Sequence, residues 1–414
     1  MKNLIERTKC RICSSPILKF LNLGVQPLPN AFKSPGEYEY KFPLEVAYCP
    51  RCHLVQLIQV VSPKLLFSEY SFITSSSPGQ KEHLRHLAIN INEEFNIEND
   101  LIIDIGGNDG TLSKYFNDLG NYSINVDPAG NLAKYSRRKG VRTIISLMNT
   151  EVANYILGEF GEAKAITSTN SFAHIDDLPG LTRNIKQLLK EEGVFILEVP
   201  HLLSLMKSNQ FDTIYFEHLS YFSLKSLIYL FKEAGLDLFR VEKIPIHGGS
   251  IRAYIKKNRK PEDSVQTLLE EEEKYGLYKY DTYLEFEGKI RSIKEEFVEF
   301  LMELKKEDKL VCGYGAAAKG TVLLNYCGID LSLIKCIYDN SPTKIGKLVP
   351  GVHIPVVSEE LLYRDHPNYL VLLPWNWFDI IYLKEKKFVD YGGRWILVIP
   401  KLKIIPEVGV KWRI

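Results

Sequence analysis

The chain has 414 residues, of which 45% are hydrophobic and 25% are charged. This composition excludes gross disorder, and the length predicts about two to four domains. The chain has 52 basic and 51 acidic residues, and the resulting net charge of +1 argues against a protein that coats a polyanion. No apolar run approaches the roughly 20 residues of a membrane span, and the first residues lack the apolar stretch of an export signal. We expect the protein in the cytoplasm.

Four of the seven cysteines lie in the first 52 residues, in the pairs Cys10-Arg-Ile-Cys13 and Cys49-Pro-Arg-Cys52. Each C-x2-C pair favours a tight turn that points two thiolates at one place, and two such turns complete a tetrahedron around zinc. Two disulfides are the competing interpretation, which a cytosolic location disfavours. Since four thiolates leave no open position on the metal, the sequence predicts a structural zinc site bound by Cys10, Cys13, Cys49 and Cys52.

Short strand-like pieces broken by proline and glycine fill residues 1–70, the predicted zinc-binding domain. A polar helix is expected over 79–95. The pattern then changes to strand, loop and helix in repetition. Strands are predicted at 101–105, 123–127, 165–168 and 193–199. This alternation is typical of a parallel sheet with helices on both faces, so the fold class is α/β and residues 71–260 form a central domain.

The last third of the chain has two parts. Residues 261–305 are charged and predicted to be a helical linker. A second series of strands and helices over 306–414 predicts a C-terminal Rossmann-like α/β domain.

A glycine-rich loop, Asp104-Ile-Gly-Gly-Asn-Asp-Gly110, follows the first strand of the central domain and precedes a predicted helix. Open α/β sheets bind ligands at such positions. The spacing fits neither G-x-G-x-x-G nor a P-loop. Asp127 ends the second strand, where an acid commonly binds ribose hydroxyls. The alternative is a strand–turn–helix unit without a ligand.

The loop and its acid together resemble the S-adenosylmethionine site of class I methyltransferases. This resemblance implies that the central domain is a class I methyltransferase domain. It assigns cofactor binding to Asp104, Gly106, Asn108, Gly110 and Asp127.

A second glycine-rich loop, Gly313-Tyr-Gly-Ala-Ala-Ala-Lys-Gly320, also lies between a strand and a helix. Its small residues let phosphates approach backbone N–H groups, and Lys319 supplies a positive charge. Asp339 ends the next strand, as in a dinucleotide-binding unit. Alone, the loop is compatible with NAD or with a packing turn that binds nothing. With a methyltransferase loop upstream, we favour Gly315, Lys319 and Asp339 as contacts to the diphosphate or nucleoside of the substrate.

A wider resemblance comes from the order of motifs along the chain. These are the two cysteine pairs, Gly24-Val-Gln-Pro-Leu-Pro-Asn-Ala-Phe32, Thr74-Ser-Ser-Ser-Pro78, the first glycine-rich loop, Asn170-Ser-Phe-Ala-His174, Tyr215-Phe-Glu-His-Leu-Ser-Tyr-Phe-Ser223, His247-Gly-Gly-Ser250 and the second glycine-rich loop. Together they resemble the sugar C-methyltransferases that act on keto-deoxysugar nucleotides, over essentially the whole chain. One position departs from that pattern, because Phe216 stands where the family segment Tyr-His-Glu-His has its first histidine.

The resemblance implies a mechanism. A 4-keto group acidifies the sugar proton at C3, a base removes it, and the enolate attacks the methyl group of S-adenosylmethionine. By resemblance, His218 or Tyr215 is the base and Glu217 a positioning or charge-balancing group. Tyr70 and His174 complete the site, and Asn170 joins the cofactor-binding residues. An imidazole favours His218, because its ordinary pKa lies closer to neutrality than that of a phenol. Read singly, each of these residues is also compatible with a structural role.

Two other functions fit parts of the sequence. A zinc-ribbon RNA methyltransferase is disfavoured by the near-neutral charge and by the lack of a basic, aromatic-interleaved stretch near the cysteines. A non-catalytic methyltransferase-fold assembly protein is disfavoured by the intact Asp104, Gly106, Gly110 and Asp127. We therefore predict S-adenosylmethionine and structural zinc as cofactors. The expected partner is a small sugar nucleotide, with no nucleic acid and no membrane.

Overall fold

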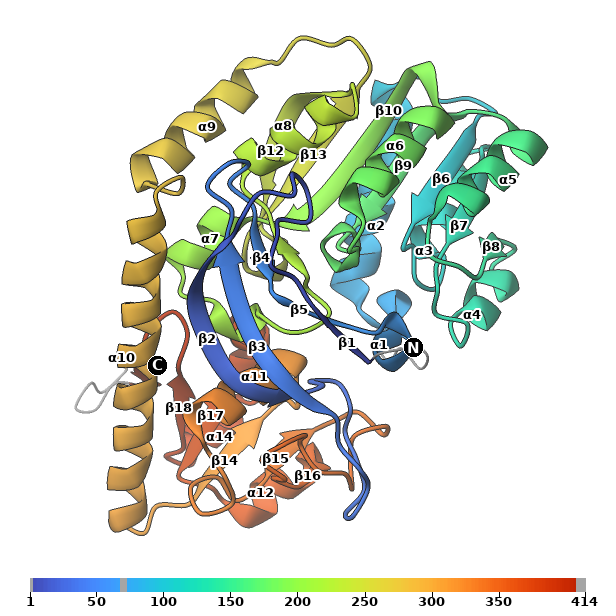
Figure 1. Ribbon diagram of the computed structural model, residues 1–414. Helices are drawn as coiled ribbons and strands as arrows, with labels where there is room; N and C mark the ends of the chain where they lie inside the picture. Colours follow the sequence, from blue (N-terminus) through green and yellow to red (C-terminus); the bar gives the residue numbers. More distant parts are fainter. Residues whose placement is uncertain (1–2, 68–72, 407–414) are drawn as a thin grey trace. The chain divides into compact units, whose positions relative to one another are not determined.

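The computed structural model describes residues 3–67 and 73–406 (Figure 1). The chain forms two compact units, each assembled from three stretches of sequence. The first unit consists of Met1–Lys19, Ala47–Ser204 and Leu219–Tyr280. The second unit consists of Phe20–Val46, Leu205–His218 and Asp281–Ile414. The chain thus enters the second unit three times. The domain boundaries expected at residues 70, 260 and 305 stay predictions.

The first unit is built on a seven-stranded sheet in the order β12-β13-β10-β9-β6-β7-β8. The bounds are β6 Leu101–Ile105, β7 Tyr122–Val126, β8 Arg142–Ile144, β9 Ala163–Thr169, β10 Leu189–Pro200, β12 Asp237–Ile244 and β13 Ser250–Lys256. Strands β6 to β10 are parallel, whereas β13 pairs antiparallel with β10 and β12. The order reverses at β6, and such a switch point leaves a crevice at the carboxyl ends of the strands. The first glycine-rich loop follows β6.

Helices cover both faces of this sheet (Figure 1). They are α2 Pro78–Glu94, α3 Thr111–Asp118, α4 Ala133–Arg138, α5 Thr150–Phe160, α6 Leu178–Leu188, α8 Leu224–Glu233 and α9 Asp263–Tyr275. Helix α7 Leu202–Lys207 follows β10, and its residues are divided between the two units. Four of these helices begin at a side chain that accepts a hydrogen bond from the backbone N–H three residues on. These caps are Ser77, Asn149, Asp177 and Ser223. Such residues satisfy N–H groups that the first helical turn leaves unpaired.

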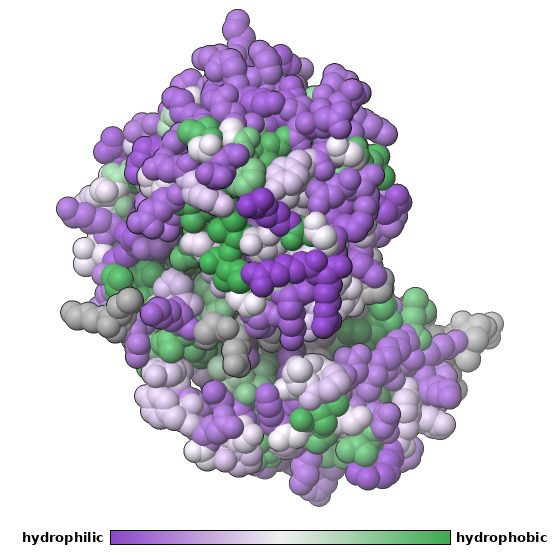
Figure 2. Space-filling model, turned by 90° about the vertical axis from the view of Figure 1, so that its right-hand side faces the viewer, coloured by the Kyte–Doolittle hydropathy of each residue, from purple (hydrophilic) through white to green (hydrophobic). Residues whose placement is uncertain are grey.

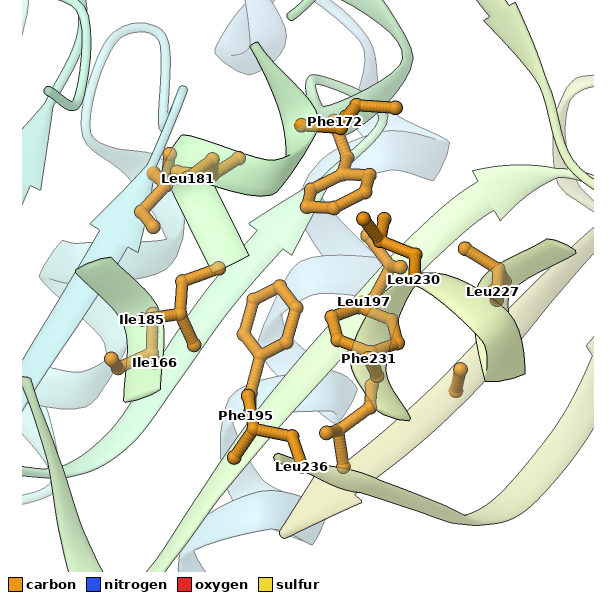
Figure 3. Close-up of a cluster of buried hydrophobic side chains, with 14 of the residues drawn as sticks. Ile166, Phe172, Leu181, Ile185, Phe195, Leu197, Leu227, Leu230, Phe231 and Leu236 are labelled. Atoms are coloured by element: carbon orange, nitrogen blue, oxygen red, sulfur yellow. The ribbon is translucent and has the colours of Figure 1, made fainter. Parts of the chain in front are cut away.

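Alternate residues of the strands face opposite layers of helices. On one face Ile102 of β6 belongs to a buried cluster with residues of α2 and α3. On the other face Ile166, Phe195 and Leu197 pack with residues of α6 and α8 (Figure 3). There the rings of Phe172, Phe195 and Phe231 have centroids 5.8 to 6.1 Å apart. Phe172 lies in the Asn170–His174 motif, so this core fixes the motif at the end of β9.

A further part of the first unit contains short strands and one helix, all from the N-terminal residues except β11. These are β1 Leu4–Glu6, β4 Val55–Leu57, β5 Gln59–Val61, α1 Pro63–Phe67 and β11 Ser220–Tyr221. β1 pairs with β5, and β4 pairs with β11, both antiparallel. Strand β4 therefore holds the segment that directly follows His218.

The second unit is built on a six-stranded sheet in the order β16-β15-β14-β17-β18-β19. The bounds are β14 Val311–Tyr314, β15 Ile337–Asp339, β16 Val356–Ser358, β17 Tyr369–Leu372, β18 Arg394–Leu397 and β19 Lys403–Ile405. The first five are parallel and β19 is antiparallel. Because the order reverses at β14, the second glycine-rich loop also follows a switch-point strand. Both α/β folds expected from the sequence are thus present.

The other elements of the second unit are α10 Tyr280–Lys306, α11 Ala318–Cys327, α12 Leu362–Asp365, α13 Phe378–Lys384 and α14 Lys386–Asp390, with β2 Leu18–Pro27 and β3 Lys41–Tyr48 from the early part of the chain. Helix α10 is amphipathic. Its buried residues recur every three or four positions, at Tyr283, Phe286, Ile290, Ile293, Phe297, Leu301 and Leu304. Helices α9 and α10 occupy the region where the sequence predicts a helical linker.

Among the described residues, no helix is both long and apolar enough to cross a membrane. Figure 2 shows one face of the molecule, on which hydrophilic residues predominate and hydrophobic residues form smaller groups between them. This is the surface of an ordinary globular protein.

Candidate active site

The two cysteine pairs converge in the first unit. The four Sγ atoms all lie within 4.8 Å of one another, and the four thiols are free. Cys10 and Cys52, and likewise Cys13 and Cys49, have their Sγ atoms 3.4 Å apart. A disulfide needs about 2.05 Å, whereas Zn–S bonds of about 2.3 Å in a tetrahedron place the sulfurs about 3.8 Å apart. The donor set fits zinc, and the competing disulfide interpretation is wrong.

Arg11, between the first two cysteines, fastens the metal-binding turn to the rest of the first unit. Its side chain is fully buried and donates to Gln56 Oε1 at 3.0 Å and to the carbonyl of Leu57 at 2.8 Å. Its remaining guanidinium nitrogen lies 3.6 Å from Asp176 Oδ1. Asp176 follows His174 by two positions, so the zinc turn supports the turn that contains His174.

The first glycine-rich loop requires glycine at two positions that the sequence assigned to cofactor binding. Gly106 has φ +73°, and a Cβ there would lie 2.3 Å from the Cβ of Ser171. Gly110 has φ +71°, and a Cβ there would lie 2.7 Å from the Cβ of Ser136. Asn108, between them, is also left-handed, with φ 55°. The loop therefore packs tightly against the end of β9, where the Asn170–His174 motif begins.

Asp104 lies next to the end of β6, Asp127 directly follows the adjacent strand β7, and both are buried. Asp104 Oδ1 accepts from Thr167 Oγ1 at 2.9 Å, and Oδ2 has no partner among the described residues. Burial raises the pKa of Asp104 to about 7. The oxygens of Asp127 accept from the backbone N–H groups of Asn108 and Ala129, each at 2.8 Å. Burial raises the pKa of Asp127, and these two bonds oppose the rise.

Asn170 has the geometry of a ligand-binding residue. It is left-handed, with φ 56°, and its backbone N–H donates to the carbonyl of Glu198 at 2.8 Å. Both polar atoms of its side chain are buried and lack a partner among the described residues, as does Oδ1 of Asn125 on β7. Buried polar atoms without partners are costly. Together with Asp104 Oδ2 they form a polar set near the carboxyl ends of β6, β7 and β9 that fits the S-adenosylmethionine expected there.

Sequence reasoning missed the side-chain contacts that brace this loop. Lys139 Nζ lies 2.8 Å from Asp109 Oδ2 and donates to Thr111 Oγ1 at 2.7 Å. Asp109 also accepts from the backbone N–H of Ser75 at 3.2 Å. The position of Asp109 inside the glycine-rich loop is a signal that could have identified it. Lys139 lies 30 positions from Asp109 in the chain, and no local pattern identifies it.

His174 lies in the first unit with the cofactor-binding residues. Burial lowers the pKa of His174 to about 4, so its ring is neutral at pH 7. The ring stacks on Phe67, with centroids 6.0 Å apart and planes 9° apart. Tyr70, predicted in the same site, lies outside the described residues.

The other base and acid candidates lie in the second unit. His218 Nδ1 is 2.8 Å from the carbonyl oxygen of Thr213, and its ring lies over that of Tyr215, with centroids 4.1 Å apart. Because a carbonyl only accepts, Nδ1 carries the hydrogen in this contact. In the neutral ring the lone pair is therefore on Nε2, the form that a base with a fixed orientation requires.

Glu217, between Tyr215 and His218, is 3% exposed. Its Oε1 accepts from Asn30 Nδ2 at 2.9 Å, and its Oε2 has no partner among the described residues. Burial raises the pKa of Glu217 to about 7. Asn30 was not among the predicted site residues, although it lies in one of the quoted motifs. Phe216, the departure from the family pattern, is fully buried against Phe42.

Two half-buried lysines contact the second glycine-rich loop, Lys319 from within it and Lys344 from a later turn. Gly315 has φ +80°, and a Cβ there would lie 2.6 Å from Pro374. Lys319 Nζ donates to Asn376 Oδ1 at 2.7 Å, and Lys344, which sequence reasoning missed, donates to the carbonyl of Ala316 at 2.8 Å. Burial lowers the pKa of both lysines.

Asp339 stabilises this loop by accepting two backbone hydrogen bonds. Its carboxylate oxygens accept from the N–H groups of Ala316 at 2.6 Å and Ser341 at 2.7 Å. A contact from Asp339 to a substrate stays a prediction. The structure thus groups Tyr215, Glu217 and His218 with Gly315, Lys319 and Asp339 in one unit, and the cofactor set with His174 in the other.

Comparison with known proteins settles the family. Residues 10–67 match a family described as "Putative zinc binding domain", residues 81–241 a "Methyltransferase domain" and residues 245–400 a "C-methyltransferase C-terminal domain". The C-methyltransferase NovU of Streptomyces niveus is 35% identical over 405 residues, which is 96% of each chain. The chain belongs to the C-methyltransferase family. It is an S-adenosylmethionine-dependent C-methyltransferase with a zinc-binding N-terminal region, which confirms the predicted cofactors and the family resemblance.

Solved structures also resemble parts of this C-methyltransferase. One is an S-adenosylmethionine-dependent methyltransferase from Clostridium acetobutylicum, at 14% identity and a TM-score of 0.35 over 43% of this chain and 92% of that one. Another is magnesium protoporphyrin IX methyltransferase from Synechocystis with bound S-adenosylhomocysteine, at 12% identity and a TM-score of 0.35 over 44% of this chain and 84% of that one.

Proposed function

We propose that this C-methyltransferase acts on a 4-keto-deoxysugar nucleotide and methylates the carbon alpha to the ketone, at C3. The observation that carries the proposal is the arrangement of Glu217 and His218. His218 Nδ1 is held by the Thr213 carbonyl, which leaves the lone pair on Nε2, and the preceding residue, Glu217, has a buried carboxyl group whose pKa burial raises to about 7. A base beside a neutral acid suits proton removal next to a carbonyl group.

In the proposed reaction His218 Nε2 takes the C3 proton, and the electron pair of the C–H bond passes to the ketone oxygen. The protonated carboxyl of Glu217 stabilises the negative charge by a hydrogen bond from Oε2, the oxygen without a partner among the described residues. Asn30 holds the other oxygen. S-adenosylmethionine supplies the methyl group, which the enolate carbon receives as the methyl–sulfur bond breaks. Tyr215 is the alternative base, because its ring lies against His218.

The nucleotide part of the substrate has a suitable site in the same unit. Lys319 and Lys344 flank the second glycine-rich loop, and neither forms an ion pair within the described part of the chain. Burial lowers the pKa values of both lysines, because it disfavours the charged ammonium form. A dianion bound nearby would favour the charged form again. A diphosphate meets this requirement, and Gly315 lets it approach the backbone. Reduced cysteines such as those of the zinc site persist in the cytoplasm, so we propose that location.

The test follows the proton and the methyl group separately. With a 4-keto-deoxysugar nucleotide in D2O and no methyl donor, the enzyme should exchange the C3 proton, as seen by NMR. His218→Asn should lower exchange and methylation together by about 10²–10⁴-fold, the usual contribution of a general base, while S-adenosylmethionine still binds.

Two further variants separate the roles of the neighbouring residues. If exchange persists at the wild-type rate in His218→Asn and is lost in Tyr215→Phe, the base is Tyr215. Glu217→Gln should lower exchange less than His218→Asn, because an amide still donates a hydrogen bond. Transfer of labelled methyl groups to RNA instead, or to neither substrate, would refute the proposal.

A further inference from the structure

One set of contacts in the second unit joins the second glycine-rich loop to the base candidate. Trp375 begins a short 3-10 helix, Trp375–Trp377, after β17. Its indole Nε1 donates to Asp212 Oδ2 at 2.7 Å, and Lys319 Nζ lies 4.4 Å from the centroid of its ring. The indole therefore touches both the loop lysine and a carboxylate 163 positions away in the chain.

Asp212 is fully buried and belongs to the 3-10 helix Phe211–Thr213. The next residue, Thr213, provides the carbonyl oxygen that holds His218 Nδ1 at 2.8 Å. A buried carboxylate is expensive to leave without a hydrogen bond, so the indole N–H ties this short helix to the turn after β17. The position of the Thr213 carbonyl then sets the tautomer and the orientation of His218.

We propose that Trp375 and Asp212 are positioning residues that couple the binding of the substrate's phosphate groups at Lys319 to the orientation of His218. This proposal rests on the proposed function, because it takes His218 as the base and Lys319 as a phosphate contact. Lys319 lies over the ring and donates to Asn376, the neighbour of Trp375. A phosphate that attracts Lys319 therefore acts on both residues of this turn. The phosphate groups of the substrate, which are distant from the reacting carbon, would thus contribute to turnover as well as to affinity.

The contacts of Trp375 can be removed one at a time. Phenylalanine at position 375 would keep the cation–π contact and lose only the N–H donor. Asparagine at position 212 would keep an oxygen that accepts from the indole and lose only the charge. Trp377, two positions from Trp375, is 42% exposed and serves as a matched control.

The kinetic test measures C3 proton exchange at saturating keto-sugar nucleotide. Trp375→Phe should lower kcat about 10-fold to 100-fold, as expected when a catalytic group is displaced by a fraction of an ångström to an ångström. The KM for the sugar nucleotide should change by less than about 3-fold, since the lysine and the glycine loop remain. Asp212→Asn should keep most of the turnover, and Trp377→Phe should match wild type. Wild-type kcat in Trp375→Phe would overturn the proposal.

A spectroscopic test does not depend on turnover. The ¹⁵N resonances of His218, assigned by comparison with His218→Asn, should show a protonated Nδ1 in the wild type and averaged tautomers in Trp375→Phe. Addition of inorganic pyrophosphate should shift them in the wild type but not in Trp375→Phe. If the wild type exchanges no keto-sugar nucleotide while these shifts occur, the proposed substrate is wrong and the coupling stands. Identical His218 spectra in both proteins would refute the coupling itself.

Discussion

Glu217→Gln tests directly whether the buried carboxyl group is neutral in the folded enzyme. Burial raises its pKa from 4.5 to about 7, so the folded state holds a proton that the unfolded state releases between these pH values. Stability from this group is complete below the unfolded pKa and is lost as pH rises through the folded pKa. Glutamine has no proton to lose and keeps the oxygen that accepts from Asn30. We therefore expect the variant to gain stability relative to the wild type as pH increases.

The magnitude follows from the shift. At 1.36 kcal/mol per pKa unit, a rise from 4.5 to about 7 amounts to about 3 kcal/mol over the whole titration. About 1 kcal/mol of this falls between pH 6 and pH 8, where the cysteine thiolates still hold zinc. Asp104 and Asp212 have pKa values raised in the same direction, to about 7 and about 6, but both are present in each protein. Their contributions cancel in the difference between the two.

The assay is urea unfolding of wild type and Glu217→Gln at pH 6 and pH 8. If the dependence of the unfolding free energy on urea has the same slope in both proteins, a shift of the midpoint reports a change in stability. The variant should gain about 1 kcal/mol relative to wild type between the two pH values. Glu296→Gln, at an exposed position of α10, is the control and should show no such change. Parallel stability curves for wild type and Glu217→Gln would mean that the carboxyl group is ionised, and would remove the proposed hydrogen bond to the enolate.

Three further predictions concern the first unit. Cys49→Ser should release zinc and lower stability, because zinc binding is coupled to folding; elemental analysis should find one zinc per wild-type chain, and Cys327→Ser should keep it. Asp127→Ala should weaken S-adenosylmethionine binding by about 1–3 kcal/mol, and unchanged calorimetric affinity would show that Asp127 does not bind the cofactor. Gly106→Ala should abolish cofactor binding, because its Cβ would lie 2.3 Å from that of Ser171; wild-type affinity would contradict this packing argument.

Local patterns in the sequence were enough to predict several features of this enzyme. The spacing of Cys10, Cys13, Cys49 and Cys52 predicted the metal site, since two C-x2-C turns determine where their own thiolates point. Strand, glycine loop and helix in repetition predicted both α/β sheets, because hydrophobic periodicity and turn residues act over a few positions. The acid at the end of β7 followed from the same reasoning. Each of these signals is contained within a short stretch of chain.

Only the tertiary structure revealed the contacts that join distant parts of the chain in the candidate site. Asn30 reaches Glu217 across 187 positions, and Trp375 reaches Asp212 across 163. Lys344 joins the second glycine-rich loop from a turn that no motif marks. The sequence could name Glu217 and His218 by resemblance, but it could not predict that burial raises the pKa of the Glu217 carboxyl or that His218 Nδ1 lies beside the Thr213 carbonyl. Those properties depend on burial and on hydrogen-bond partners that folding brings together from distant parts of the chain.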